Sequence, residues 1–132
     1  KYPLGMGTSE TQDNIFITQQ KIINQLVEKE SCIIVGRCSD YILKNMENSF
    51  HVYIYASYED KLRNCVELLH MKEDEARKMI IDVDKARASY HKHYTGYAIN
   101  DMRYKDLLIN SSLLGVDGTA ELIAELVRKK YM

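Results

Sequence analysis

The sequence predicts an α/β sandwich of three layers, in which helices cover a mainly parallel β-sheet. Three short apolar segments have the pattern of strands, and segments with helical periodicity separate each from the next. The first segment, 32–35, is a continuous apolar run, which is typical of a strand buried on both faces of a parallel sheet. Strands that alternate with helices favour this architecture.

Residues 1–14 are expected to form a loose lead-in, and residues 15–132 a single domain long enough to bury a core. Capping residues and apolar spacing predict five helices, which begin at Asp13, at Ser39 or Asp40, at the capping box of Ser57, at about Glu73 and at Asp117. Strands are predicted at 32–35, 50–56 and 106–110.

The apolar stripes of the longer helices predict which of their faces are buried. These stripes are Ile15, Ile22, Ile23, Leu26 and Val27 in the first helix, Leu62, Cys65, Val66 and Leu69 in the third, Ala76, Met79, Ile80 and Val83 in the fourth, and Leu122, Ile123, Leu126 and Val127 in the last.

The composition argues against several classes of partner. The net charge is −1, so no global field attracts nucleic acid or an anionic membrane, and any anion site must be local. No apolar run approaches the roughly 18 residues of a membrane span, and no leader resembles a signal peptide. We therefore expect a cytoplasmic protein without nucleic-acid or membrane partners.

The three cysteines are expected to be free thiols, because their positions lack metal-ligand spacing. Cys32 and Cys65 are predicted on buried faces and Cys38 in a loop.

Gly36 and Arg37 follow the first predicted strand at its carboxyl end, where α/β folds bind ligands. Glycine lets the backbone approach a ligand closely, and the Arg37 guanidinium is a rigid fork that suits phosphate or carboxylate. The alternative is a loop arginine that caps carbonyl groups or pairs with Asp40. Position alone favours neither interpretation.

A second concentration of positive charge lies in the segment 84–105. From residue 85 onward it holds five Lys or Arg residues and a single acid, with four tyrosines between them. The apolar stripe of its helix extends to Arg87, where an aliphatic residue would be expected. A buried guanidinium needs a partner, which is either Asp82, Asp84 or a bound anion. A solvated charged face is the alternative explanation of the same run.

The same segment contains His91 and His93, which diverge on a helix because they are two residues apart, so no metal site is predicted there. The tyrosines fit either stacking on a nucleotide base or amphipathic packing.

Four stretches resemble the cytidylate kinase-like family of P-loop nucleoside monophosphate kinases, and their order and spacing match over about residues 15–132. They are SCIIVGRCSDYIL, HVYIYASYEDKL, DKARASYHKHYTG and DLLINSSLLGVDGTAELI. The resemblance implies a P-loop NTPase-like fold and an enzyme that moves the γ-phosphoryl group of ATP to a nucleoside monophosphate, typically CMP or dCMP. It also implies that Mg²⁺ bridges the phosphates.

The resemblance further implies roles for particular residues. Arg37, with Gly36 and Asp40 close by, is expected to bind the phosphate of the acceptor. Lys61 falls among the substrate-binding positions, where relatives often carry an arginine.

The segment 84–105 corresponds to the lid of these kinases. Arg87, helped by Lys85, is expected to move onto the transferring phosphoryl group. Such a role agrees with the chemistry, because phosphoryl transfer depends on positioning and on neutralising the equatorial oxygens.

One part of the family pattern is missing. The glycine-rich loop G-x-x-x-x-G-K-[ST] does not occur, and Gly5 and Gly7 have the wrong spacing for it. In this fold the strand before that loop lies between the strands predicted at 32–35 and 50–56, and without it two buried edges would be unpaired. We therefore expect the chain to be part of a longer protein and inactive alone.

Two other functions stay open at this stage. One is a non-catalytic regulatory module that binds a nucleotide or phosphate on the same scaffold, and the other is a kinase for a different phosphorylated acceptor. The sequence identifies neither the preferred base nor the oligomeric state, a homo-oligomer included.

Overall fold

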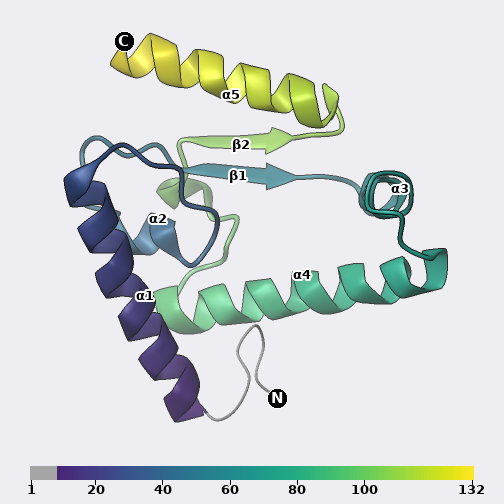
Figure 1. The fold of residues 1–132 in the computed structure, drawn as a ribbon, viewed down its shortest axis with the longest axis horizontal. Coiled ribbons are helices and arrows are strands. Elements are labelled where there is room, and N and C mark those ends of the chain that lie inside the picture. The colour runs from purple at the N-terminus through teal and green to yellow at the C-terminus, as the bar shows by residue number, and fades with distance from the viewer. Residues whose placement is uncertain (1–8) are drawn as a thin grey trace. The chain divides into compact units, whose positions relative to one another are not determined.

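A computed structural model describes residues 9–132 of the chain, and the predictions for residues 1–8 lie outside this range (Figure 1). The elements, in chain order, are α1 (Ser9–Lys29), α2 (Ser39–Ile42), β1 (Val52–Tyr55), α3 (Tyr58–Glu67), α4 (Glu73–Thr95), the 3₁₀ turn η1 (Met102–Tyr104), β2 (Leu107–Asn110) and α5 (Gly115–Tyr131).

The two strands of the described chain form a parallel pair. Val52 lies opposite Leu107 and Tyr55 opposite Asn110, and the two arrows point the same way in Figure 1. Parallel neighbours require a crossover connection, which here contains α3 and α4. The mixed α/β class and the parallel sheet that the sequence predicts are therefore confirmed.

The strand predicted at 32–35 is wrong. This segment has no strand structure, and Ile33 is 94% and Val35 is 85% exposed. A strand is stable only when a neighbour takes up its backbone hydrogen bonds, and the sheet of residues 9–132 contains only β1 and β2. Cys32, predicted to be buried, is exposed for the same reason.

Residues 9–132 divide into two compact units, which are described separately. The first unit contains residues 9–49 and 84–104, and the second contains residues 50–83 and 105–132. The C-terminal part of α4 therefore belongs to the first unit and its N-terminal part to the second. A single domain over 15–132 stays a prediction.

The core of the first unit joins α1, the turn before α2, and α4. Phe16, Cys38 and Tyr90 are its buried members, and Tyr41, Ile42 and Tyr94 pack against them. The rings of Phe16 and Tyr94 stack with their centroids 4.4 Å apart. Aromatic side chains thus supply most of this core, as their large apolar surfaces allow.

The core of the second unit lies between α3 and α4. Its buried members are Cys65, Ala76 and Ile80, three of the residues predicted from the apolar stripes. Ser57 caps α3 as predicted, because its hydroxyl accepts a hydrogen bond of 3.1 Å from the Asp60 N–H. Leu69, predicted on the same face, lies beyond the end of α3 and is exposed.

The predicted buried face of α1 is only partly correct. The helix begins at Ser9, ahead of the expected cap at Asp13. Its buried residues are Gln12, Phe16 and Ile23, whereas the predicted core positions Ile15, Ile22 and Leu26 are exposed. The buried face of α1 is the one that carries Phe16, which stacks on Tyr94. The predicted stripe, chosen by apolar residues alone, lies on a different part of the helix surface.

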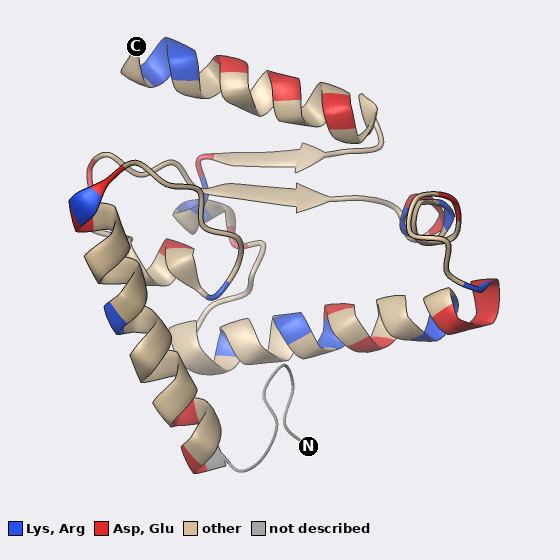
Figure 2. Cartoon of the chain, in the orientation of Figure 1, with Lys and Arg blue, Asp and Glu red and all other residues tan. Residues whose placement is uncertain are grey.

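The last helix also begins earlier than predicted. α5 starts at Gly115 with Leu114 as its N-cap residue, which offers no side-chain hydrogen bond, so a cap at Asp117 is wrong. Asp117 instead lies in the first turn, and Arg128, Lys129 and Lys130 lie in the last turn (Figure 2). Both sets of charges oppose the partial charges of the helix dipole and stabilise the helix.

All three cysteines are free thiols, with Cys38 and Cys65 buried. Within residues 9–132, no helix combines the length and the apolar character that crossing a membrane requires.

Candidate functional site

The predicted Gly-Arg site is a turn of unusual backbone conformation. Gly36, Arg37 and Cys38 all have left-handed backbone conformations, with φ angles of 69°, 59° and 56°. A Cβ on Gly36 would meet no atom within 4 Å, so the positive φ rather than close packing favours glycine there. The turn is closed by a hydrogen bond of 3.1 Å from the Ser39 N–H to the Gly36 carbonyl.

Two of these residues, Arg37 and Cys38, carry side chains that disfavour this conformation. A non-glycine residue in the left-handed region is strained by roughly 1–2 kcal/mol. Such strain persists only where the surrounding structure holds the backbone, and it is concentrated at functional sites. The turn is therefore the first candidate site on geometric grounds.

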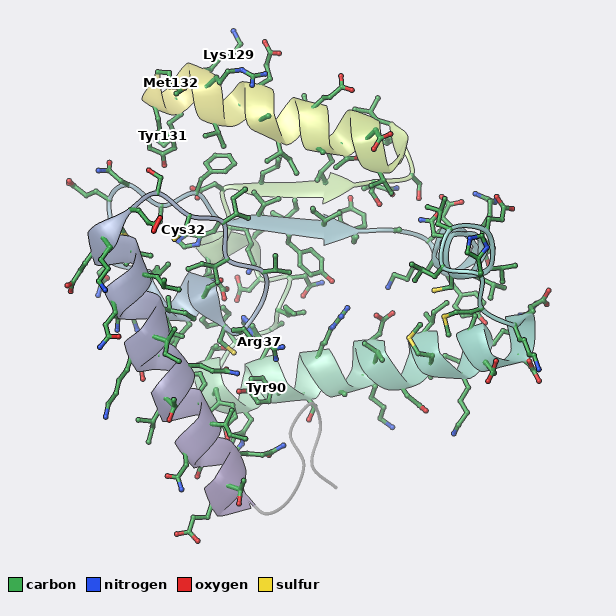
Figure 3. All side chains as sticks on the ribbon, viewed as in Figure 1. Cys32, Arg37, Tyr90, Lys129, Tyr131 and Met132 are labelled. Atoms are coloured by element: carbon green, nitrogen blue, oxygen red, sulfur yellow. The ribbon has the colours of Figure 1, made fainter. Side chains whose placement is uncertain are left out.

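Arg37 itself is exposed, and its neighbour in the first unit is Tyr90 of α4 (Figure 3). Cys38, the next residue along the chain, packs against Tyr90 in the core and fixes the turn on that helix. Within residues 9–132 the Arg37 guanidinium forms no ion pair. The pairing of Arg37 with Asp40, one form of the loop-arginine interpretation, is therefore not observed.

Asp40 is buried and engaged elsewhere. The Tyr97 hydroxyl donates a hydrogen bond of 3.0 Å to its Oδ2 atom, and His91 Nε2 lies 3.2 Å from both carboxylate oxygens. Burial is the main cause that raises the pKa of Tyr97, and the neighbouring Asp40 charge raises it further. The Asp40 carboxylate thus faces the core, not the solvent beside Arg37.

Arg87 lies on the same side of α4 as the turn. It is three residues before Tyr90 and four before His91, the spacings that place side chains on one helix face. Arg87 is exposed, however, which agrees with the alternative of a solvated charged face and not with a buried guanidinium. Within the described chain Arg87 has no ion-pair partner, and Asp82 pairs with Lys78 at 3.5 Å.

Of the other two predicted cations, Lys85 is not brought to this place. Lys85 is exposed and lies two residues from Arg87, which on a helix places it about 200° around the axis. Lys61 is a half-buried residue of α3 in the second unit. Arg37 and Arg87 are therefore the two guanidinium groups that the first unit places beside one face of α4.

The lid-like segment 84–105 is positively charged along α4 but is otherwise tightly packed. Figure 2 shows Lys and Arg without acids on the C-terminal part of this helix. Arg103 binds Asp101 at 2.7 Å, and the Lys92 ammonium donates to the Gly96 carbonyl at 3.2 Å, so these two cations are occupied.

The tyrosines of the segment 84–105 pack against other aromatic rings. Tyr97 and Tyr104 stack with their centroids 3.8 Å apart, Tyr90 lies against Tyr94, and Tyr94 against Phe16. Of the two predicted uses of these rings, the structure therefore supports packing.

The described residues do not fit a metal site. Within residues 9–132 no group of three or more His, Cys, Asp or Glu side chains is arranged to hold an ion. His93, the partner of His91 in the H-x-H pair, is exposed and lies edge-on to Tyr94.

His91 and Tyr97 are the residues of this site that the sequence did not identify. For His91 the helical spacing was a usable signal, because residues 90, 91 and 94 continue the apolar stripe of α4 beyond Arg87. For Tyr97 there was none, because its bond to Asp40 joins residues 57 positions apart.

A parallel-sheet α/β chain with two exposed arginines beside one helix face has the features of a protein that binds phosphate or carboxylate groups. Comparison with known proteins identifies the family of the chain. The chain belongs to the cytidylate kinase-like family, whose sequence profile matches residues 2–113.

Proteins similar to this chain include a kinase and a protein of known structure. A cytidylate kinase from Sulfolobus acidocaldarius is 24% identical over 104 residues, which are 79% of this chain and 57% of the kinase. The chain thus spans little more than half the length of that relative. A crystal structure of an uncharacterized protein from Eubacterium ventriosum superposes with a TM-score of 0.80 at 30% identity and covers 88% of this chain and 73% of that protein.

Proposed function

We propose that this protein is a kinase that transfers the γ-phosphoryl group of ATP to a nucleoside monophosphate such as CMP or dCMP. Family membership supports a kinase-like function at the level of the class. The observation that carries the proposal is a pair of exposed guanidinium groups, Arg37 and Arg87, which lie beside one face of α4 and form no ion pair with any of residues 9–132. A three-layer P-loop NTPase-like sandwich belongs to the same proposal.

The two arginines have different tasks in this proposal. Arg37 lies on a turn held against the core, which suits a group that fixes the acceptor phosphate in one place. Its fork can donate two parallel hydrogen bonds to phosphate oxygens. Gly36 supplies the backbone conformation that this turn requires.

Arg87 carries its charge on the exposed surface of a helix, where it neutralises the phosphoryl group as it moves between donor and acceptor. Lys85 adds positive charge to the same helix as Arg87, and a role for Lys61 stays a prediction from the family resemblance. Asp40 acts indirectly, through the turn that precedes it.

ATP and Mg²⁺ are the expected donor and metal, but the described residues do not fit either. The sequence contains no G-x-x-x-x-G-K-[ST] loop, and residues 9–132 contain no cluster of metal ligands. We therefore assign no residue of this chain to the donor nucleotide or to the metal, and the proposed roles concern the acceptor and the transferred group alone.

A non-catalytic module that binds nucleotide through the same arginines is the second candidate. It rests on the same two exposed guanidinium groups, which can bind an anion without any phosphoryl transfer. The two candidates share a binding site and differ in turnover, so one set of measurements separates them.

The test is a thermal-shift and calorimetry panel of CMP, dCMP, AMP, UMP and inorganic phosphate, followed by an assay of ATP consumption with each acceptor. A ligand that binds only the folded state raises the melting temperature. Acceptor-dependent ATP consumption supports the kinase, and binding without consumption supports the module. Absence of any shift with every nucleotide and with phosphate overturns the assignment of Arg37 and Arg87 as an anion site.

A further inference from the structure

We propose that Asp40, His91 and Tyr97 form a positioning network that holds the Arg37 turn on α4, with His91 as its central member. All three side chains belong to the first unit, so the network lies within one compact body. Its effect on substrate binding rests on the function proposed above, whereas its effect on the turn does not depend on any ligand.

The network is built in a buried place. Asp40 is 7%, His91 4% and Tyr97 7% exposed. A carboxylate in such surroundings needs hydrogen-bond donors, and Asp40 receives one from the Tyr97 hydroxyl at 3.0 Å. His91 Nε2 lies 3.2 Å from both oxygens of the same carboxylate.

The second ring nitrogen of His91 is held as well. Nδ1 lies 3.2 Å from the Tyr97 carbonyl oxygen and 3.1 Å from the Thr95 hydroxyl. The Thr95 hydroxyl in turn donates to the His91 carbonyl at 2.7 Å. Because hydrogen-bonding partners lie at both ring nitrogens, the orientation of the ring is fixed from two sides.

The network reaches the Arg37 turn through Asp40. Asp40 is the second residue of α2, directly after the turn, and the Ser39 N–H closes that turn by donating to Gly36. Two non-glycine residues there have left-handed backbone conformations, which persist only when their surroundings hold them. Cys38 anchors the turn by packing, and Asp40 anchors it by hydrogen bonds.

The same network connects the turn with the helix segment that carries Arg87. His91 lies four residues after Arg87, one helical turn along the same face of α4. The contact between His91 and Asp40 therefore fixes the Arg37 turn relative to Arg87. A reaction that depends on positioning is sensitive to a change in that relation, and a displacement of about 1 Å costs up to roughly a hundredfold in rate.

The test compares His91→Leu, which removes both contacts, with His91→Gln, which keeps a donor near the position of Nε2. Hydrogen exchange of the Ser39, Tyr41 and Ile42 amides reports on the turn and on α2, because these N–H groups donate to Gly36 and Cys38. We expect His91→Leu to speed their exchange and to raise the KM or Kd for CMP roughly tenfold, with a smaller effect on kcat. We expect His91→Gln to restore most of both.

His93→Leu is the matched control, because His93 is an exposed histidine two residues further along α4. It is expected to leave amide exchange and CMP affinity unchanged. Unchanged exchange of the turn in folded His91→Leu overturns the network. If that variant does not fold, Tyr97→Phe, which removes a single hydroxyl, decides the question by the same exchange measurement.

The two ways of failing are distinguishable. If wild-type protein binds no CMP, the proposed function fails, and the exchange data alone support or overturn the network. If CMP binds equally well to wild type and His91→Leu while the turn exchanges faster, the turn does not position the acceptor, and the positioning role is overturned.

Discussion

Arg37 lies beside the buried ring of Tyr90, and its positive charge opposes the rise in the Tyr90 pKa that burial causes (Figure 3). The two residues are brought together by Cys38, which packs against Tyr90 and continues the turn that Arg37 occupies. Arg37 thus stands on a turn that is anchored to the core, while Arg37 itself stays exposed. This is the arrangement expected of a group that binds an anion from solvent.

Replacement of Arg37 tests its proposed role directly. We expect Arg37→Ala to raise the Kd or KM for CMP roughly 10–100-fold, because hydrogen bonds between charged groups are lost. Arg37→Lys should recover only part of the affinity, since an ammonium lacks the bidentate fork. Arg77→Ala is the control, as Arg77 is an exposed arginine of α4 that pairs with Glu73 at 2.6 Å. Equal affinities in all four proteins would exclude Arg37 from the site.

Arg87 is expected to act on the rate more than on binding. Arg87→Ala removes charge that neutralises the moving phosphoryl group, so kcat should fall roughly a hundredfold or more while the KM for CMP changes little. Lys85→Ala should have a much smaller effect, because Lys85 lies about 200° around the helix from Arg87. Steady-state kinetics with CMP and ATP measure both. A larger loss in Lys85→Ala than in Arg87→Ala would contradict the assignment.

Local signals in the sequence predicted local structure well. Ser57 caps its helix because the bond it accepts comes from a residue three positions away, and the apolar stripe with Cys65, Ala76 and Ile80 forms the core of the second unit. The segment 32–35 failed because a strand depends on a partner that no local pattern encodes.

For the candidate site, the exposure and the contacts of the predicted residues were foreseen only in part. The exposed arginines were found from their positions after a strand-like segment and on a helix, but the premise that Arg87 is buried was wrong. The bonds that engage Asp40 could not be predicted, because they join residues more than fifty positions apart and depend on how α2 and α4 pack.

The ion pair between Asp101 and Arg103 makes a prediction about pH. Hydrogen bonds from the Arg103 side chain and backbone lower the pKa of Asp101 to about 2, whereas the pKa of an aspartate in an unfolded chain is about 3.9. Because the folded value is the lower one, the stabilisation is complete above about pH 4 and is lost as the pH falls toward 2. An NMR titration of the Asp101 carboxyl carbon measures this. Arg103→Gln should return the pKa toward its usual value, and an unchanged value would refute the cause.

The core of the second unit offers a matched pair of substitutions on adjacent residues of α4. Ile80 is 5% exposed and packs with Cys65 and Ala76, whereas Ile81 is 58% exposed. Ile80→Ala should lower the free energy of unfolding by about 2–4 kcal/mol, since it removes buried methyl groups and leaves a cavity. Ile81→Ala should change it by less than about 0.5 kcal/mol. Urea unfolding followed by circular dichroism measures both, and equal losses would show that α4 buries a different face.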